Sequence, residues 1–286
     1  MASDQVALDV AGLRMRYGST DVLRDVTFRA RHGEVLALLG PNGAGKTTTI
    51  EIMEGFRMRS AGRITVLGTD PARGDERWRA RLGIVLQSWR DHGKWRVREL
   101  LAHQARYYPD PWDPDRLIDA VGLTEHAGKK IRTLSGGQRR RLDVAIGIVG
   151  RPEVLFLDEP TAAFDPVARN DFHDVVRSLD TTILLTTHDL DEAEKLADRI
   201  VILDGGRIIA DGTAAELARQ IAGQDEVRWT LGGRRHAEST RDSTAFVRDL
   251  FAQYGERVRD LEVQRASLEQ TYLALVSQAE KEGRKA

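Results

Sequence analysis

A glycine-rich segment followed by a lysine and a threonine is the part of this sequence best suited to chemistry. Residues 40–47 match the pattern G-x-x-x-x-G-K-[ST], follow an apolar run at 35–39 and precede an expected helix. Glycines let such a loop turn its backbone N–H groups toward a phosphate, and the helix start adds positive potential. The predicted phosphate site comprises Gly40, Pro41, Asn42, Gly43, Ala44, Gly45, Lys46, Thr47 and Thr48.

Within this segment two side chains can act on a nucleotide triphosphate. Lys46 is placed to reach the β- and γ-phosphates, and the hydroxyl of Thr47 can ligate Mg²⁺. A second apolar run, 154–157, ends in Asp158, a carboxylate that would hold the same ion, and Glu159 follows, positioned to polarise an attacking water. Together these residues predict ATP hydrolysis assisted by Mg²⁺.

The five residues Leu134-Ser135-Gly136-Gly137-Gln138, called the signature below, are the motif that best indicates the protein family. Ser135 would cap the helix that follows, whose N-terminus is a second site suited to an anion. With this motif the chain resembles the nucleotide-binding subunit of the ATP-binding cassette (ABC) transporters. The resemblance implies that Ser135, Gly136, Gly137 and Gln138 face the γ-phosphate bound to a second subunit.

Four further residues follow the family pattern in order, and the resemblance implies a role for each. Tyr17 resembles the aromatic residue that stacks on adenine. Gln87 resembles the glutamine that binds Mg²⁺ and couples it to the membrane partner. Asp165 resembles the acid that crosses the dimer interface, and His188 resembles the switch histidine that contacts the γ-phosphate.

Short apolar strands alternate with helical stretches, which indicates an α/β chain. With the resemblance, we expect a RecA-like P-loop core, an antiparallel β subdomain carrying Tyr17, and a helical subdomain over about residues 88–150. Together they make a nucleotide-binding domain over residues 1–222. Residues 223–286 are expected to form a small α+β appendage in the order β-α-β-α, with a regulatory or dimer-stabilising role. The motif at 267–275 is similar to the end of daunorubicin-type drug exporter ATPases.

Composition excludes several other classes. Hydrophobic residues make up 41% and charged residues 30%, an ordinary globular mixture, and cysteine is absent, which excludes disulfides and thiolate chemistry. The net charge of −1 provides no field that would attract nucleic acid, so no nucleic-acid partner is expected. No apolar run in the sequence is long enough to cross a membrane. Residues 1–9 lack a basic start and a long apolar core, so we expect no signal peptide.

We therefore expect the ATPase subunit of a transporter at the cytoplasmic face of the membrane. Its partners would be a separate permease and a second ATPase subunit, identical or different, and its cargo a drug or other hydrophobic compound for export. Two alternatives stay open: an importer ATPase, and a soluble ABC ATPase acting on nucleic acid or in translation. Residues 88–97, which include Trp89 and Trp95, are expected either to dock the permease or to fold back onto the helical subdomain.

Overall fold

The computed structural model describes residues 5–85, 92–161, 164, 166–221, 225–240, 242–264, 269 and 272. The chain divides into two compact units, Met1–Ile208 and Ile209–Ala286. The predicted boundary at residues 222 and 223 lies further along the chain. Between the two positions lie the end of β9 (Arg207–Gly212) and helix α8 (Ala214–Ile221).

A six-stranded sheet with the strand order β5-β6-β7-β3-β8-β9 forms the centre of the first unit. The neighbouring pairs from β5 to β8 are all parallel. Their sequences are nearly continuous apolar runs, as expected for strands buried on both faces. The bounds are β3 (Val35–Leu39), β5 (Leu82–Val85), β6 (Val154–Asp158), β7 (Thr182–Thr187) and β8 (Arg199–Asp204).

Parallel strands end at a common edge of the sheet, and ligands bind at that edge in open α/β folds. The P-loop leads from β3 into helix α1 (Lys46–Met53). Along the chain, helix α6 (Pro166–Arg177) connects β6 to β7, and α7 (Leu190–Leu196) follows β7. The arrangement confirms the predicted α/β core and brings the ends of β3, β6 and β7 together.

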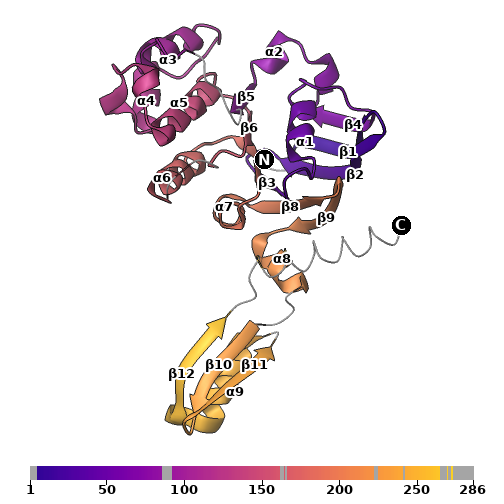
Figure 1. Cartoon of the computed structure of the whole chain (residues 1–286), viewed down its shortest axis with the longest axis vertical. Helices are drawn as coiled ribbons and strands as arrows, with labels where there is room; N and C mark the ends of the chain where they lie inside the picture. The colour runs from indigo at the N-terminus through magenta and orange to yellow at the C-terminus, as the bar shows by residue number, and fades with distance from the viewer. Residues whose placement is uncertain are drawn as a thin grey trace. The chain divides into compact units, whose positions relative to one another are not determined.

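A three-stranded antiparallel sheet in the order β2-β1-β4 packs on this core (Figure 1). Alternate residues of β1, among them Leu8 and Val10, join the same buried cluster as Leu36 and Phe156 of the central sheet. The sheet therefore shares one hydrophobic core with the nucleotide-binding strands. Its strands are β1 (Val6–Tyr17), β2 (Thr20–Arg31) and β4 (Ala61–Val66).

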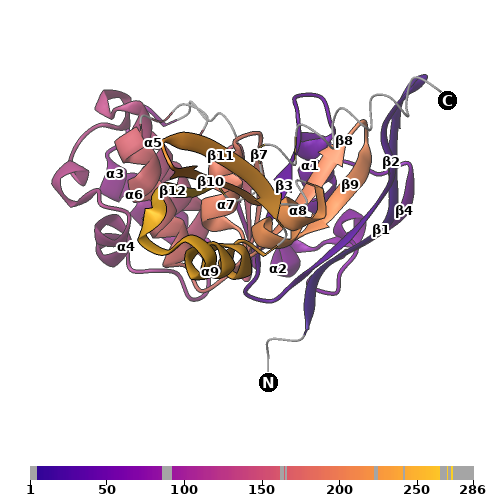
Figure 2. The same ribbon diagram turned by 90° about the horizontal axis from the view of Figure 1, so that it is seen from below.

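Three helices gather on the other side of the central sheet, well away from α1 in both views (Figures 1 and 2). They are α3 (Val97–Ala105), α4 (Pro114–Ala120) and α5 (Gly136–Ile148). Asp113 caps α4 and Ser135 caps α5, so each helix begins where its sequence supplies an acceptor for the free N–H groups. The remaining short helices of the first unit are η1 (Pro71–Arg73), α2 (Glu76–Arg79), η2 (Thr124–His126) and η3 (Ile131–Thr133).

The second unit contains a three-stranded sheet in the order β11-β10-β12 with helix α9 (Ser243–Tyr254) against one face. The hydrophobic cluster between this sheet and α9 contains the buried residues Val227, Trp229, Leu250 and Val258. The strands are β10 (Asp225–Leu231), β11 (Arg234–Thr240) and β12 (Val258–Gln264), and a short turn of helix, η4 (Gly255–Arg257), precedes β12.

The order β-α-β-α was wrong in one respect, because β11 follows β10 directly. Gly232 and Gly233 both have positive φ, 58° and 80°, which suits a two-residue hairpin turn. Strand β11 is exposed along most of its length and has no apolar alternation, which is why its sequence does not resemble a strand. Of the predicted last helix, residues 269 and 272 are described, and both are helical. In the described part of the chain, no helix is both long and apolar enough to cross a bilayer.

Candidate functional site

The P-loop is the turn between β3 and α1, and Gly45 is the residue that shapes it. Gly45 is the N-cap of α1 and has a φ of 105°. Residues other than glycine rarely adopt this backbone conformation. A Cβ atom there would lie 2.5 Å from Leu23 Cδ2. Only glycine therefore permits this turn, which leaves the free N–H groups at the start of α1 as a site for phosphate.

Lys46 lies at the first position of α1 and its side chain is 5% exposed. Its ammonium donates hydrogen bonds to the carbonyl oxygens of Gly40, at 2.8 Å, and Pro41, at 3.2 Å. The same Nζ lies 3.4 Å from Oε1 of Glu159. The loop therefore wraps around a buried cation, and this cation contacts the carboxylate that directly follows β6.

Thr186 of β7 orders both acids at the end of β6. Its hydroxyl donates to Oδ1 of Asp158 and accepts from the N–H of Glu159 at 3.1 Å. The N–H of Glu159 also approaches the Thr186 carbonyl oxygen at 3.1 Å. Asp158 Oδ1 lies 3.4 Å from the Thr47 hydroxyl as well. One carboxylate and one hydroxyl thus converge beside the P-loop, and both are oxygen donors of the kind Mg²⁺ prefers.

His188 brings a third segment to the same point, since its Nδ1 lies 3.4 Å from Oε1 of Glu159. The structure therefore joins the predicted residues Lys46, Glu159 and His188 around one carboxylate. A small cavity of about 60 Å³ adjoins Glu159 and His188. Its other lining residues are Thr161, Arg169, Thr187, Asp189 and Glu192.

Sequence reasoning did not single out Glu192, which is 1% exposed behind this cavity. Burial raises the pKa of Glu192, and hydroxyl contacts from Thr187 and Thr161 partly offset that rise. The sequence did contain a signal for this residue. Asp189 is the N-cap of α7 and Glu192 stands three positions later, the spacing of a capped helix start.

The signature residues lie at the start of α5, apart from α1 in both overall views (Figures 1 and 2). The Ser135 hydroxyl accepts from the N–H of Gln138 at 3.3 Å, and the Gln138 side chain accepts from the N–H of Ser135 at 3.0 Å. This reciprocal capping box leaves Ser135 and Gly136 exposed. Within one chain, the signature thus forms a surface and stands apart from the cluster around Glu159.

Tyr17 ends β1 and is 39% exposed. The guanidinium of Arg57 lies 5.1 Å from the ring centroid, and Arg57 is held by Glu51 at 2.6 Å. This cation–π contact was not anticipated from the sequence. It means that one face of the Tyr17 ring already has a planar cation against it.

Gln87, Asp165 and Trp89 lie outside the described residues. Trp95 is described, and its ring lies 5.0 Å from that of His103 in α3, centroid to centroid. Trp95 was expected either to dock the permease or to fold back onto the helical subdomain. The structure shows a contact of the second kind.

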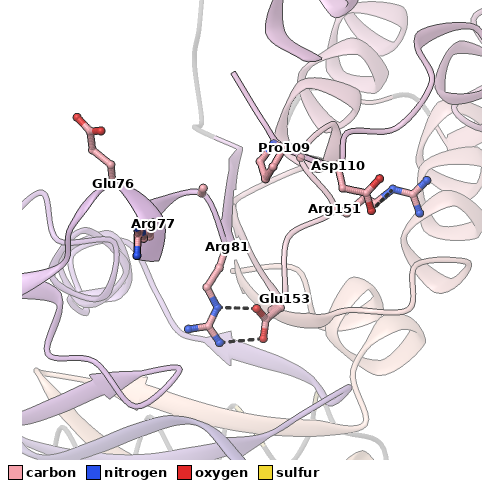
Figure 3. Close-up of a pocket in the computed structure, with 9 residues that line it drawn as sticks. Glu76, Arg77, Arg81, Pro109, Asp110, Arg151 and Glu153 are labelled. Atoms are coloured by element: carbon pink, nitrogen blue, oxygen red, sulfur yellow. Dashed lines mark hydrogen bonds and ion pairs between the residues drawn. The ribbon is translucent and has the colours of Figure 1, made fainter. Parts of the chain in front are cut away.

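A larger cavity, of about 420 Å³, lies at the opposite ends of β5 and β6 from the predicted site. Its walls are residues of α2, of the segment before α4 and of the segment before β6 (Figure 3). Arg81 and Glu153 form two hydrogen bonds across its edge, at 2.5 and 2.9 Å. None of the predicted site residues lines this cavity.

The fold and the site define a class of protein. A parallel sheet with a P-loop after one strand and paired acids after another is the arrangement of P-loop nucleoside triphosphatases. A buried lysine, two acids and a histidine are residue types that can act in phosphoryl transfer to water.

Comparison with known proteins gives the family. The ABC transporter family model matches residues 23–162. The daunorubicin resistance ATP-binding protein DrrA3 of Streptomyces coeruleorubidus is 41% identical over 232 residues, covering 76% of this chain and 71% of that protein. The Nod factor export ATP-binding protein I of Ralstonia nicotianae is 39% identical over 259 residues, covering 88% and 78% respectively. The solved structure of an ATP-binding subunit of an ABC transporter has a TM-score of 0.68 and 29% identity, covering 75% of this chain and 92% of that chain.

The chain belongs to the ABC transporter family as an ATP-binding subunit that hydrolyses ATP.

Proposed function

We propose that this subunit powers the export of a drug or other hydrophobic compound through a separate membrane permease. The similarity to proteins named for daunorubicin resistance and for Nod factor export supports the direction of transport. A third relative, the linearmycin resistance ATP-binding protein LnrL of Bacillus subtilis, is 33% identical over 79% of this chain. The subunit would work at the cytoplasmic face of the membrane, bound to the permease.

The observation that carries the ATPase mechanism is the convergence of Lys46, Glu159 and His188 within 3.4 Å contacts. Lys46 would bind oxygens of the β- and γ-phosphates, which replace Glu159 as partners of its ammonium. Glu159 would then be free to orient a water in line with the γ-phosphate and accept its proton. His188 would donate a hydrogen bond to a γ-phosphate oxygen, where charge develops in the transition state.

The donors beside the P-loop fit Mg²⁺. Thr47 and Asp158 supply a hydroxyl and a carboxylate oxygen, and phosphate oxygens and water would complete the set, as is usual for this ion. Gln87 is proposed as a further ligand. When bound, Mg²⁺ neutralises part of the phosphate charge.

The complete site is proposed to need two chains. The exposed start of α5 offers N–H groups and the Ser135 hydroxyl to the γ-phosphate of ATP held by the partner subunit. Asp165 would cross the same interface, and Tyr17 would stack on adenine. The partner can be a second copy or a related chain.

Residues 223–286, which belong to the second unit, are proposed to regulate or stabilise that dimer. This unit carries its own small core around Trp229 and Leu250, but none of the residues in the ATPase mechanism. A chain that ends at residue 222 should therefore bind ATP as the full chain does and form a weaker dimer. Loss of ATP binding by a folded truncated chain would place the second unit in the site.

Reconstitution with the permease tests export. The permease candidate would be a membrane protein of about six predicted spans encoded beside this chain. It would be purified with this chain and placed in vesicles with the ATPase subunits outside. ATP added outside should then move daunorubicin, the probe compound, from the vesicle medium into the lumen, because outward transport in the cell is inward in this orientation. Transport in the opposite direction, dependent on a solute-binding protein, would favour the importer alternative.

A further inference from the structure

Three consecutive arginines in α5 point in three directions, because successive residues of a helix are about 100° apart. Arg139 pairs with Asp143 of the same helix at 3.4 Å. Arg141 reaches the carbonyl oxygen of Gly122 at 3.4 Å. Arg140 alone of the three is buried, with 7% of its surface exposed.

The Arg140 guanidinium brackets the residue that we propose as the catalytic base. Its Nε donates to the carbonyl oxygen of Pro160 at 2.8 Å. Its Nη2 donates to the carbonyl oxygen of Asp158 at 3.2 Å. The two acceptors belong to the residues immediately before and after Glu159. One planar guanidinium therefore binds the main chain on both sides of Glu159.

The backbone at Glu159 requires such support. Its φ is 43°, in the left-handed region that residues other than glycine seldom occupy. Glu159 also precedes a proline, which further restricts the backbone dihedral angles that Glu159 can adopt. From the β7 side, Thr186 binds the Glu159 N–H. Arg140 binds from the side of α5, so the conformation is held from two elements.

Burying the Arg140 guanidinium costs free energy, so packing alone does not explain why an arginine occupies this position. Burial lowers the pKa of Arg140, because its charge loses hydration in the fold. A buried guanidinium is tolerated when its donors are satisfied, and here they bind two main-chain carbonyl oxygens beside the site. An apolar residue would avoid this cost but would leave both carbonyl oxygens without the guanidinium.

We propose that Arg140 is a positioning residue for ATP hydrolysis, which fixes the backbone around Glu159 and thereby the direction of its carboxylate. The inference rests on the proposed role of Glu159. Since α5 begins at the signature, the same contact joins the signature helix to the catalytic strand within one chain.

The test compares R140M, R140K and the matched control R141M in the full chain. Methionine keeps the length of the side chain without its donors, and lysine keeps the charge without the planar fork. We expect R140M to lower kcat about 10-fold or more and R140K to fall between it and the wild type. ATP affinity and KM should stay within about twofold, and R141M should match the wild type in all of these. Circular dichroism melts establish that each variant is folded.

A second measurement separates positioning from a general structural role. In the E159Q background, single-turnover hydrolysis of ATP labelled in the γ-phosphate should fall less than about twofold on adding R140M, since the group being positioned is already lost. An equal fold loss in both backgrounds would overturn the proposal, as would a kcat of R140M equal to that of R141M. If R140M does not fold, the same criteria apply to R140K. A wild-type rate in E159Q alone would instead refute the proposed role of Glu159.

Discussion

The two ends of strand β6 both carry ion pairs, but one end buries its charges and the other leaves them in water. At the carboxyl end, Lys46 and Glu159 are 5% and 13% exposed. At the amino end, Arg81 and Glu153 are 42% and 46% exposed beside the larger cavity (Figure 3). The exposed pair has the shorter contact, 2.5 Å against 3.4 Å.

The difference shows that contact distance alone does not determine how much an ion pair contributes to stability or to chemistry. An exposed pair is screened by water and contributes up to about 1 kcal/mol, whereas a buried charge that loses its partner costs several times more. Buried charges also act more strongly on a bound substrate, because little solvent screens them. Substitutions at the carboxyl end should therefore affect chemistry, and those at the amino end should have small effects.

The largest effect is expected from K46A. The substitution removes the buried cation of the P-loop, so hydrolysis should fall by more than about 1,000-fold and ATP binding should weaken. Phosphate release and nucleotide titration measure the two effects. The control is K195A, which removes an exposed lysine of α7. Turnover at the wild-type rate in K46A would contradict the P-loop assignment.

E159Q should slow hydrolysis by about 100-fold or more while ATP binding persists, because the base is lost and Lys46, Thr47 and Asp158 remain. An ATP-bound dimer should accumulate, and light scattering with Mg-ATP would detect it. A variant that stays monomeric under these conditions would count against the signature acting on the partner's ATP.

Sequence reasoning located the motifs at the carboxyl end of β6, and the signature at the start of α5, because each has a local cause. The glycine pattern and the apolar run before Asp158 mark strand ends, and Ser135 is a helix cap. The same reasoning placed the fold class and most strands. Local patterns also fail where the partner is distant: Thr186 is one threonine in an apolar strand, and its bonds to Asp158 and Glu159 depend on β6 lying beside β7.

Arg140 shows the same limit more sharply. Three adjacent arginines are equivalent in the sequence, and only the packing of α5 selects the middle one for burial. The apolar positions of α5, such as Leu142 and Ala145, could have oriented the helix but not named the carbonyl oxygens that Arg140 would reach. Strand β11 is missed for a different reason, since an exposed edge strand needs no apolar face.

Glu54 extends the comparison to stability. This residue follows α1, is 4% exposed, and its Oε2 has no hydrogen-bond partner within the described part of the chain. Burial, with the charges of Asp158 and Glu51, raises the pKa of Glu54 from 4.5 to about 8. The folded protein holds a proton there that the unfolded chain loses, so the stabilising effect is complete below pH 4.5 and is lost as the pH rises to about 8.

E54Q should remove this pH dependence, which amounts to roughly 5 kcal/mol at most across the whole interval between the two pKa values. Urea unfolding of the nucleotide-free protein at about pH 6 and about pH 8 measures it. The wild type should lose more stability between the two than E54Q does. The exposed residue Glu194 provides the control E194Q, which should behave as the wild type. Equal losses in the wild type and E54Q would show that Glu54 is already ionised at the lower pH.

The smallest effect is expected at the amino end of β6. A double-mutant cycle with R81A and E153A should give a coupling free energy below about 1 kcal/mol, and added salt should reduce it further. The two parallel hydrogen bonds place the pair toward the upper part of that range. ATP hydrolysis should stay within about twofold of the wild type in all three variants, because Arg81 and Glu153 lie at the strand ends opposite the P-loop. A coupling of several kcal/mol, or a loss of hydrolysis comparable to that of E159Q, would mean that exposure does not separate the two ends of the strand.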